Sequence, residues 1–130
     1  MKQAIAARKA ISVLCIEDEA DLRDDMVEEL EYAGFTVRGV DCAEAAMKIL
    51  KSEIYSIIIC DIRLPGISGL ELLKHVRTQQ EYNENIPFIV MSAYDDPPLR
   101  YSLTAHGASS FLVKPVEYEK IIKDILALLS

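Results

Sequence analysis

The 130-residue sequence lacks a long uninterrupted hydrophobic run. Its longest apolar stretch, around Ile54 to Cys60, is far shorter than the roughly 20 residues that a transmembrane helix needs. Residues 1–10 also lack the continuous apolar stretch of a secretory signal. We therefore expect a cytoplasmic protein without a membrane span, with residues 1–10 as a leading arm and residues 11–130 as one domain.

The sequence also lacks a cluster of basic residues. Its formal net charge is −7, from 14 Lys and Arg residues against 21 Asp and Glu residues. A nucleic-acid-binding domain ordinarily carries a basic patch that matches the phosphate backbone. Direct binding to nucleic acid is therefore not expected.

No two cysteines have the C-x-x-C spacing of a metal or redox motif. The three cysteines are Cys15, Cys42 and Cys60, and two of them lie in apolar runs. Unpaired cysteines in apolar runs are typical of a reduced protein core. We interpret all three as free thiols, which agrees with a cytosolic location.

Five strand-length apolar runs alternate with helical patterns along the chain. They are Ile11–Ile16, Phe35–Val40, Ile57–Cys60, Phe88–Met91 and Phe111–Val113. After each run, apolar residues recur at helical spacing. Strict alternation of strands and helices predicts a doubly wound α/β domain, with a five-stranded parallel sheet covered by five helices on its two faces.

Helix-start signals stand between the strands and the helical patterns. The spans Asp41–Glu44 and Ser68–Glu71 both match a capping box. Asp96 followed by Pro97 matches an N-cap residue and a proline at the first helical position. These signals predict where three of the helices begin.

Functional side chains follow the strands at the point where each strand ends. They are Glu17 and Asp18 after the first strand, Asp61 after the third, Ser92 after the fourth, and Lys114 with Pro115 after the fifth. Ligands of open parallel sheets bind at the carboxyl ends of the strands. We therefore expect these groups to gather at one edge of the sheet.

Three neighbouring carboxylates repel one another unless a cation neutralises them. Oxygen ligands without Cys or His favour Mg²⁺, with Mn²⁺ as the alternative. Lys114 would add a mobile positive charge and Ser92 a hydroxyl donor. A carboxylate nucleophile, a metal, a cation and a donor together are what phosphoryl transfer requires.

At these residues the sequence resembles the response-regulator receiver family over about residues 11–129. The resemblance is carried by Glu17-Asp18, the segment Asp61 to Gly66, Ser68-Gly69, Ser92 in VMSAY, and Lys114-Pro115 in FLVKP. It implies a flavodoxin-like sheet of order 2-1-3-4-5 and a cis peptide bond before Pro115. It also implies a two-component or phosphorelay switch that receives its phosphoryl group from a histidine kinase or a histidine phosphotransfer protein.

The resemblance also implies a role for each site residue. Asp61 would be the phosphoacceptor and Lys114 its cationic partner. The metal ligands would be Glu17, Asp18, Asp61 and the backbone carbonyl of Arg63. Ser92 and Phe111 would form the switch pair, and Phe111 has no hydroxyl, so its inward position would rest on apolar burial alone. The output surface would be the fourth helix, fifth strand and fifth helix, facing an unknown downstream protein.

Two large residues, Arg63 and Tyr94, would flank the approach of water to a phosphorylated Asp61 if the family geometry holds. Shielding there predicts slow self-dephosphorylation, and the alternative is that both side chains point into solvent. Ser109-Ser110 stand where DNA-binding relatives tend to carry acids that pair subunits. We therefore expect a monomer or a weak dimer.

Two other functions remain as alternatives. A hydrolase of the haloacid-dehalogenase kind also attacks phosphate with an aspartate, but it needs a second acid two residues later, where this chain has Arg63. A receiver-shaped module that is never phosphorylated would not need the site residues that are present. We therefore expect a switch that catalyses only its own phosphorylation and slow dephosphorylation, with no effector domain before the chain ends at Ser130.

Overall fold

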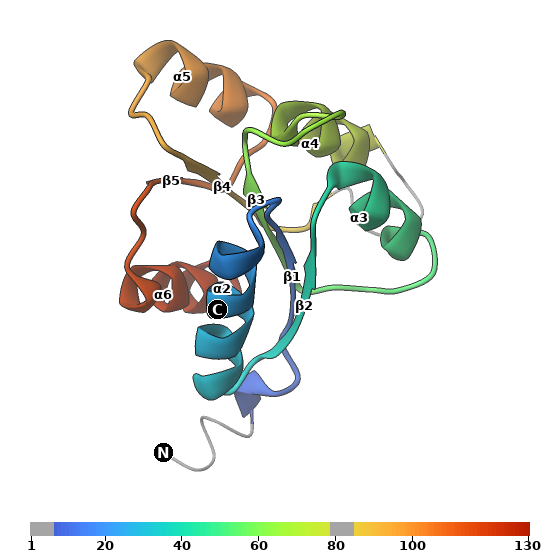
Figure 1. The fold of residues 1–130 in the computed structure, drawn as a ribbon, viewed down its shortest axis with the longest axis vertical. Helices are drawn as coiled ribbons and strands as arrows, with labels where there is room; N and C mark the ends of the chain where they lie inside the picture. The colour runs from blue at the N-terminus through green and yellow to red at the C-terminus, as the bar shows by residue number, and fades with distance from the viewer. Residues whose placement is uncertain (1–6, 79–84) are drawn as a thin grey trace.

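The computed structural model describes residues 7–78 and 85–130. In chain order the elements are β1 (Ser12–Ile16), α2 (Ala20–Tyr32), β2 (Thr36–Val40), α3 (Ala43–Leu50), β3 (Ile57–Asp61), α4 (Gly69–Thr78), β4 (Phe88–Ser92), α5 (Pro97–Ala105), β5 (Ser110–Val113) and α6 (Tyr118–Leu128) (Figure 1). All strand pairs are parallel, in the order β2-β1-β3-β4-β5. The predicted doubly wound fold and strand order are confirmed.

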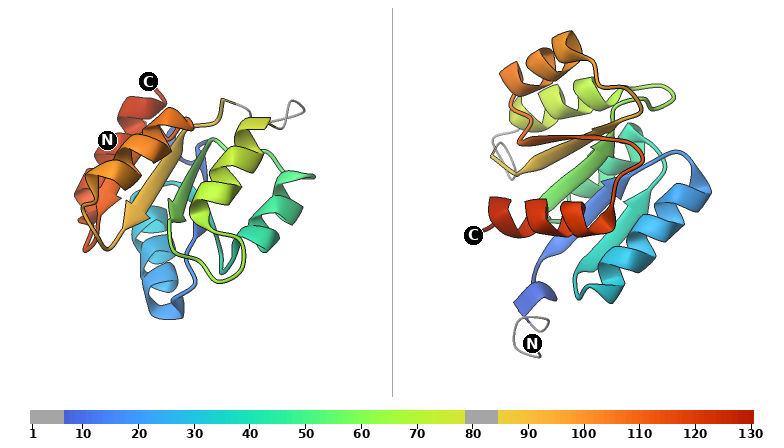
Figure 2. Two further views of the ribbon diagram at one scale, coloured as in Figure 1. Left: turned by 90° about the horizontal axis from the view of Figure 1, so that it is seen from above. Right: turned by 90° about the vertical axis from the view of Figure 1, so that its left-hand side faces the viewer.

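The helices cover both faces of the sheet. Figures 1 and 2 show α2 and α6 on one face and α3, α4 and α5 on the other. Residues along β1 alternate between the two cores, because Val13 packs with the α2 and α6 side and Leu14 with the opposite side. The longest of the described helices, α2, has 13 residues. Within residues 7–78 and 85–130, no helix is long and apolar enough to cross a membrane.

Strand burial follows position in the sheet. Every residue of β3 and β4 is buried, as expected for central strands covered on both faces. None of the residues of the edge strand β2 is fully buried. The carboxyl ends of these buried central strands are where predicted site residues lie.

Two of the three helix-start predictions are confirmed. The Glu71 backbone N–H donates to Ser68 Oγ at 3.2 Å, and the Leu99 backbone N–H donates to Asp96 Oδ1 at 3.2 Å. The prediction at Asp41 is wrong, because α3 begins one residue later and its N-cap is Cys42, without a side-chain capping bond. Asp41 thus lies outside the position from which a carboxylate reaches the free N–H groups.

All three cysteines are free, as predicted, and Cys15 and Cys60 are buried. Burial raises the pKa of the Cys15 thiol to about 12. The pKa of Cys60 is also raised, first by burial and then by the nearby carboxylates of Asp61 and Glu17. Both thiols are therefore protonated at neutral pH and act as small apolar groups in the core.

The predicted leading arm, residues 1–10, lies partly outside the described residues, since the structure describes the chain only from residue 7. In the described part, Arg8 Nη1 donates to the Ala33 carbonyl at 3.2 Å, where α2 ends. The Arg8 guanidinium also lies 5.9 Å from the centroid of the Phe35 ring. A cation at the end of a helix is favourable, so Arg8 fastens this part of the chain to the domain. The arm boundary itself stays a prediction.

Candidate functional site

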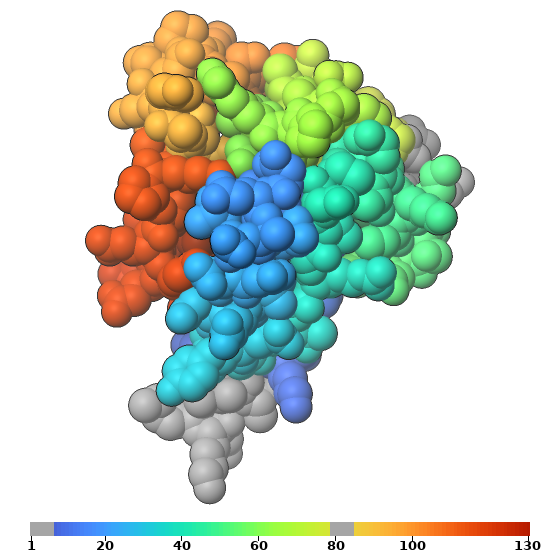
Figure 3. Space-filling view, in the orientation of Figure 1, coloured from blue at the N-terminus to red at the C-terminus, as the bar shows by residue number. Residues whose placement is uncertain are grey.

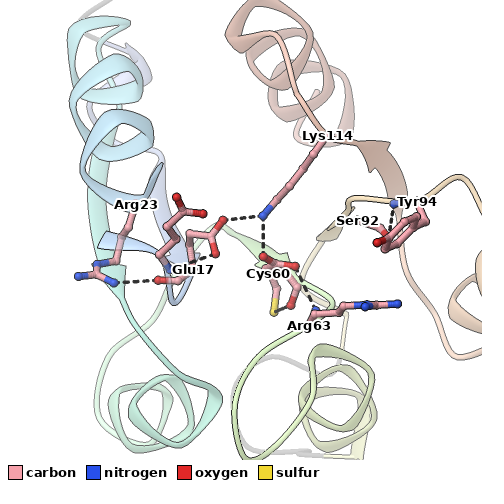
Figure 4. A network of polar contacts seen from close by, with 9 residues as sticks. Glu17, Arg23, Cys60, Arg63, Ser92, Tyr94 and Lys114 are labelled. Carbon is pink, nitrogen blue, oxygen red and sulfur yellow. Dashed lines mark hydrogen bonds and ion pairs between the residues drawn. The ribbon is translucent and has the colours of Figure 1, made fainter. Parts of the chain in front are cut away.

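The carboxyl edge of the sheet collects side chains from four strands. Glu17 directly follows β1, Asp61 ends β3, Ser92 ends β4 and Lys114 directly follows β5. In the space-filling view the segments after β1, β3 and β5 meet on one face (Figure 3). The close-up shows the Lys114 side chain reaching toward Glu17 and the acidic site (Figure 4).

Lys114 joins two carboxylates that come from different strands. Its Nζ donates to Glu17 Oε1 at 2.7 Å and to Asp61 Oδ2 at 2.6 Å. The Glu17 side chain is 1% exposed and the Asp61 side chain 9% exposed. Removing one partner of such a buried pair leaves an uncompensated charge, so these contacts hold the three residues in place. The Lys114–Pro115 peptide bond is cis.

The acidic cluster contains more negative charge than Lys114 neutralises. One carboxylate oxygen from each of Glu17, Asp18 and Asp61 can be chosen so that all three lie within 4.8 Å of one another. Burial, with a further contribution from the neighbouring Asp61, raises the pKa of Glu17 to about 7 even though Lys114 opposes the change. An all-oxygen set of this kind matches the preference of a hard divalent cation such as Mg²⁺.

The pKa of Lys114 shifts in the opposite sense to that of an isolated buried lysine. Burial alone would lower it, but the hydrogen bonds and charges of Asp61 and Glu17 raise it above its usual value. The ammonium therefore stays charged throughout the physiological pH range. A permanent positive charge lies beside Asp61.

Backbone contacts position the acidic residues. The Arg63 backbone N–H donates to Asp61 Oδ1 at 3.0 Å, and Arg23 Nη1 donates to the Glu17 carbonyl at 2.9 Å. Gly69 packs so tightly that a Cβ there would lie 2.5 Å from the Asp61 carbonyl oxygen. The roles of Arg23 and Gly69 could not be predicted from the sequence, because a donor to a backbone carbonyl and a close backbone approach leave no periodic pattern.

Ser92 lies at the same edge but is directed elsewhere. It is 1% exposed, and its Oγ accepts a hydrogen bond from the Tyr94 backbone N–H at 3.2 Å. Within the described residues it makes no hydrogen bond with Asp61. Phe111, on the neighbouring strand β5, is half-buried under the Arg100 guanidinium, which lies 4.7 Å from its ring centroid. The structure therefore places the two predicted switch residues on neighbouring strands, and within the described residues neither side chain makes a hydrogen bond with Asp61.

Arg63 and Tyr94 contact each other above the loops that follow β3 and β4. The Arg63 guanidinium lies 4.8 Å from the centroid of the Tyr94 ring, and Tyr94 is 59% exposed. Figure 4 shows both side chains on the Ser92 side of the acidic cluster. A cation–π contact of this kind ties the two loops together at the surface.

Known proteins share the sequence features of this site. The sequence model of the response regulator receiver domain matches residues 13–126. This chain belongs to the response-regulator receiver family. The receiver domain is 34% identical to the response regulator protein FleR of Pseudomonas aeruginosa over 91% of this chain and 24% of that relative. It is 34% identical to the transcriptional regulatory protein FixJ of Bradyrhizobium diazoefficiens over 84% of this chain and 52% of that relative.

Solved structures agree with the sequence relatives. The receiver domain matches the chemotaxis response regulator CheY4 of Vibrio cholerae with a TM-score of 0.85 and 27% identity, covering 92% of this chain and 98% of the other. It matches the response regulator TrrA of Thermotoga maritima, solved in complex with Mg²⁺-BeF, with a TM-score of 0.81 and 28% identity, covering 92% and 99%. The chain is thus a receiver domain of the kind found in two-component response regulators. It spans only about a quarter to a half of the sequence relatives described above.

Gly69→Ala tests the backbone contact beneath Asp61. At an open helix position Ala is more favourable than Gly by about 0.5–1 kcal/mol. Here the added Cβ would collide with the Asp61 carbonyl, so we expect the free energy of unfolding to fall by about 1–3 kcal/mol. Urea denaturation measures the change, and a variant as stable as the wild type would contradict the close approach.

Proposed function

We propose that Asp61 accepts a phosphoryl group and that this chain is the phosphoacceptor of a two-component or phosphorelay system. The observation that carries the proposal is the buried Asp61 carboxylate, held between Lys114 Nζ and the Arg63 N–H beside two further acids. The hydrolase alternative is not favoured, because Arg63 stands where that class needs an acid.

The transfer step follows from these contacts. An Asp61 carboxylate oxygen forms a bond to phosphorus while the bond from phosphorus to the donor histidine nitrogen breaks. The leaving imidazole keeps the electron pair of that bond and takes a proton from solvent. An ammonium has three N–H donors. Glu17 and Asp61 occupy two of those of Lys114, which leaves the third for a phosphoryl oxygen.

The Mg²⁺ would be held by Glu17, Asp18, Asp61 and the backbone carbonyl of Arg63. When bound, Mg²⁺ neutralises the negative charge that carboxylates and phosphoryl oxygens share. Within this chain, Arg23 fixes the loop that carries Glu17 and Asp18 through its bond to the Glu17 carbonyl. The cluster of three carboxylates beside the single ammonium of Lys114 supports the assignment of these residues as metal ligands.

The switching surface of the proposal is α5, β5 and α6, the fourth helix, fifth strand and fifth helix of the sequence analysis. Ser92 would leave its bond with Tyr94 and donate to the phosphoryl oxygen, and Phe111 would turn into the space near it. A phosphoryl group shifts the population only through such differential contacts. The donor is a histidine kinase or phosphotransfer protein, the setting is cytoplasmic, and the chain acts as a monomer or weak dimer on a downstream protein.

Asp61→Asn tests the acceptor. Incubation with acetyl phosphate and Mg²⁺, followed by intact-mass measurement, should add one phosphoryl group to the wild type and none to the variant, because an amide is a poor nucleophile for this transfer. Asp41→Asn, an exposed acid outside the cluster, should behave as the wild type. Stoichiometric uptake by Asp61→Asn would refute the acceptor assignment, and absence of uptake by the wild type from both acetyl phosphate and a kinase would favour the unphosphorylated module.

Asp18→Ala tests the metal ligands. It should weaken Mg²⁺ binding by at least about tenfold, because the site loses a charged oxygen ligand. Isothermal titration calorimetry measures the affinity, and circular dichroism checks that the variant folds. Asp21→Ala, which removes an acid from the first turn of α2 but not from the cluster, is the matched control. Equal affinity for the Asp18 variant and the wild type would remove Asp18 from the ligand set.

The lifetime of the phosphoryl group tests Arg63 and Tyr94. Because the two side chains stack on each other, we expect each of Arg63→Ala and Tyr94→Ala to speed phosphate loss and the double variant to add little more. Rates are compared after removal of the donor. Tyr101→Ala, which removes another exposed tyrosine, should leave the rate unchanged. Equal rates in the wild type and all three Arg63 and Tyr94 variants would end the shielding hypothesis.

A further inference from the structure

Arg100 makes two contacts that have no role in the proposed phosphorylation chemistry. This residue of α5 places its guanidinium 4.7 Å from the Phe111 ring centroid. Its Nη2 also lies 2.9 Å from Asp95 Oδ1, in the loop that joins β4 to α5. Arg100 therefore connects the loop after Ser92 with the aromatic residue of β5.

The contact covers Phe111 in its half-buried position. One side of Phe111 packs against the core cluster beneath α3, α4 and α5, while Arg100 stacks on the ring. Val90 of β4 pairs with Phe111 and Ser92 with Val113, so Phe111 and Ser92 belong to the same face of adjoining strands. A ring that turned toward Ser92 would leave the guanidinium behind, because Asp95 and the backbone of α5 hold Arg100 at its present position.

Two interactions of different strength make up this arrangement. The Arg100–Asp95 ion pair is exposed, with side-chain exposures of 47% and 65%, so it orients the guanidinium more than it stabilises the fold. The guanidinium–ring contact favours the ring position that it covers. A contact made in only one of two states changes the ratio of those states, here by about two- to fivefold for an exposed cation–π pair.

We propose that Arg100 is an autoinhibitory latch that holds Phe111 in its present position under the guanidinium and lowers the population of the switched state before phosphorylation. The inference rests on the proposed function and adds a regulating residue to it. The phosphoryl group favours the switched state while the latch disfavours it, so phosphoryl binding and the Arg100–Phe111 contact are thermodynamically linked. Thermodynamic reciprocity requires that removing the latch strengthen the binding of a phosphoryl mimic by the same factor by which it favours the inward ring.

The test measures both sides of this linkage in the intact chain. Beryllofluoride with Mg²⁺ serves as the phosphoryl mimic, and its affinity is titrated for the wild type, Arg100→Ala and Arg100→Lys. The chain has three phenylalanines, so ring-¹³C-labelled phenylalanine gives few NMR signals, with the buried Phe35 and Phe88 as internal references. Phe111→Leu identifies the Phe111 signals.

The latch predicts a specific pattern among the variants. Arg100→Ala should bind beryllofluoride about two- to fivefold more tightly than the wild type. Its unliganded Phe111 signals should move toward their beryllofluoride-bound position. Arg100→Lys keeps the charge without the planar stacking surface and should fall between the two. Arg38→Ala, which breaks another exposed ion pair at the distant β2 edge, should match the wild type.

Three outcomes separate the latch from the function on which it rests. Equal beryllofluoride affinity and unchanged Phe111 signals in Arg100→Ala would overturn the latch while leaving the acceptor role of Asp61 intact. Tighter binding in Arg38→Ala as well would also overturn it, because a general charge effect would then be responsible. A wild type that binds no beryllofluoride and takes no phosphate would overturn the proposed function and the latch together.

Discussion

The ammonium group of Lys114 is the contact on which the rest of the site depends. It follows β5 and bonds to Glu17 after β1 and to Asp61 at the end of β3, so one side chain spans the carboxyl edge of the sheet. Its partners are buried, and breaking such a pair typically costs about 3–5 kcal/mol. The lengths and register of the strands must therefore keep these three groups within hydrogen-bond reach. The same contacts that join the strands also bring the residues of the candidate site together.

Much of the fold and part of the site could be predicted from the sequence. The apolar runs and their alternation with helices are long-range patterns, and the parallel sheet makes the residues at strand ends neighbours whatever the details of the loops. The gathering of Glu17, Asp61 and Lys114 follows from that topology. Strand order itself came from the resemblance and not from the patterns.

The failures of sequence reasoning share a physical cause. The cap predicted at Asp41 was one residue out of register, and capping depends on a single position. The stacking of Arg100 on Phe111 and the bond from Tyr94 to Ser92 depend on rotamers and loop geometry. Such contacts join different elements or lie within one loop, so no periodic pattern of residue types records them.

The hydrogen bond between Ser92 and Tyr94 connects two parts of the site that have different proposed roles. Ser92 Oγ accepts from the backbone N–H of Tyr94, whose ring in turn carries the Arg63 guanidinium. In a phosphorylated chain of the kind proposed, moving the serine hydroxyl would release that N–H and disturb Tyr94, which is proposed to shield the phosphoryl group. The strength of a signal and its duration would then both depend on the loop that follows β4. A substitution in this loop that changed the lifetime of the phosphoryl group would then also change the population of the switched state.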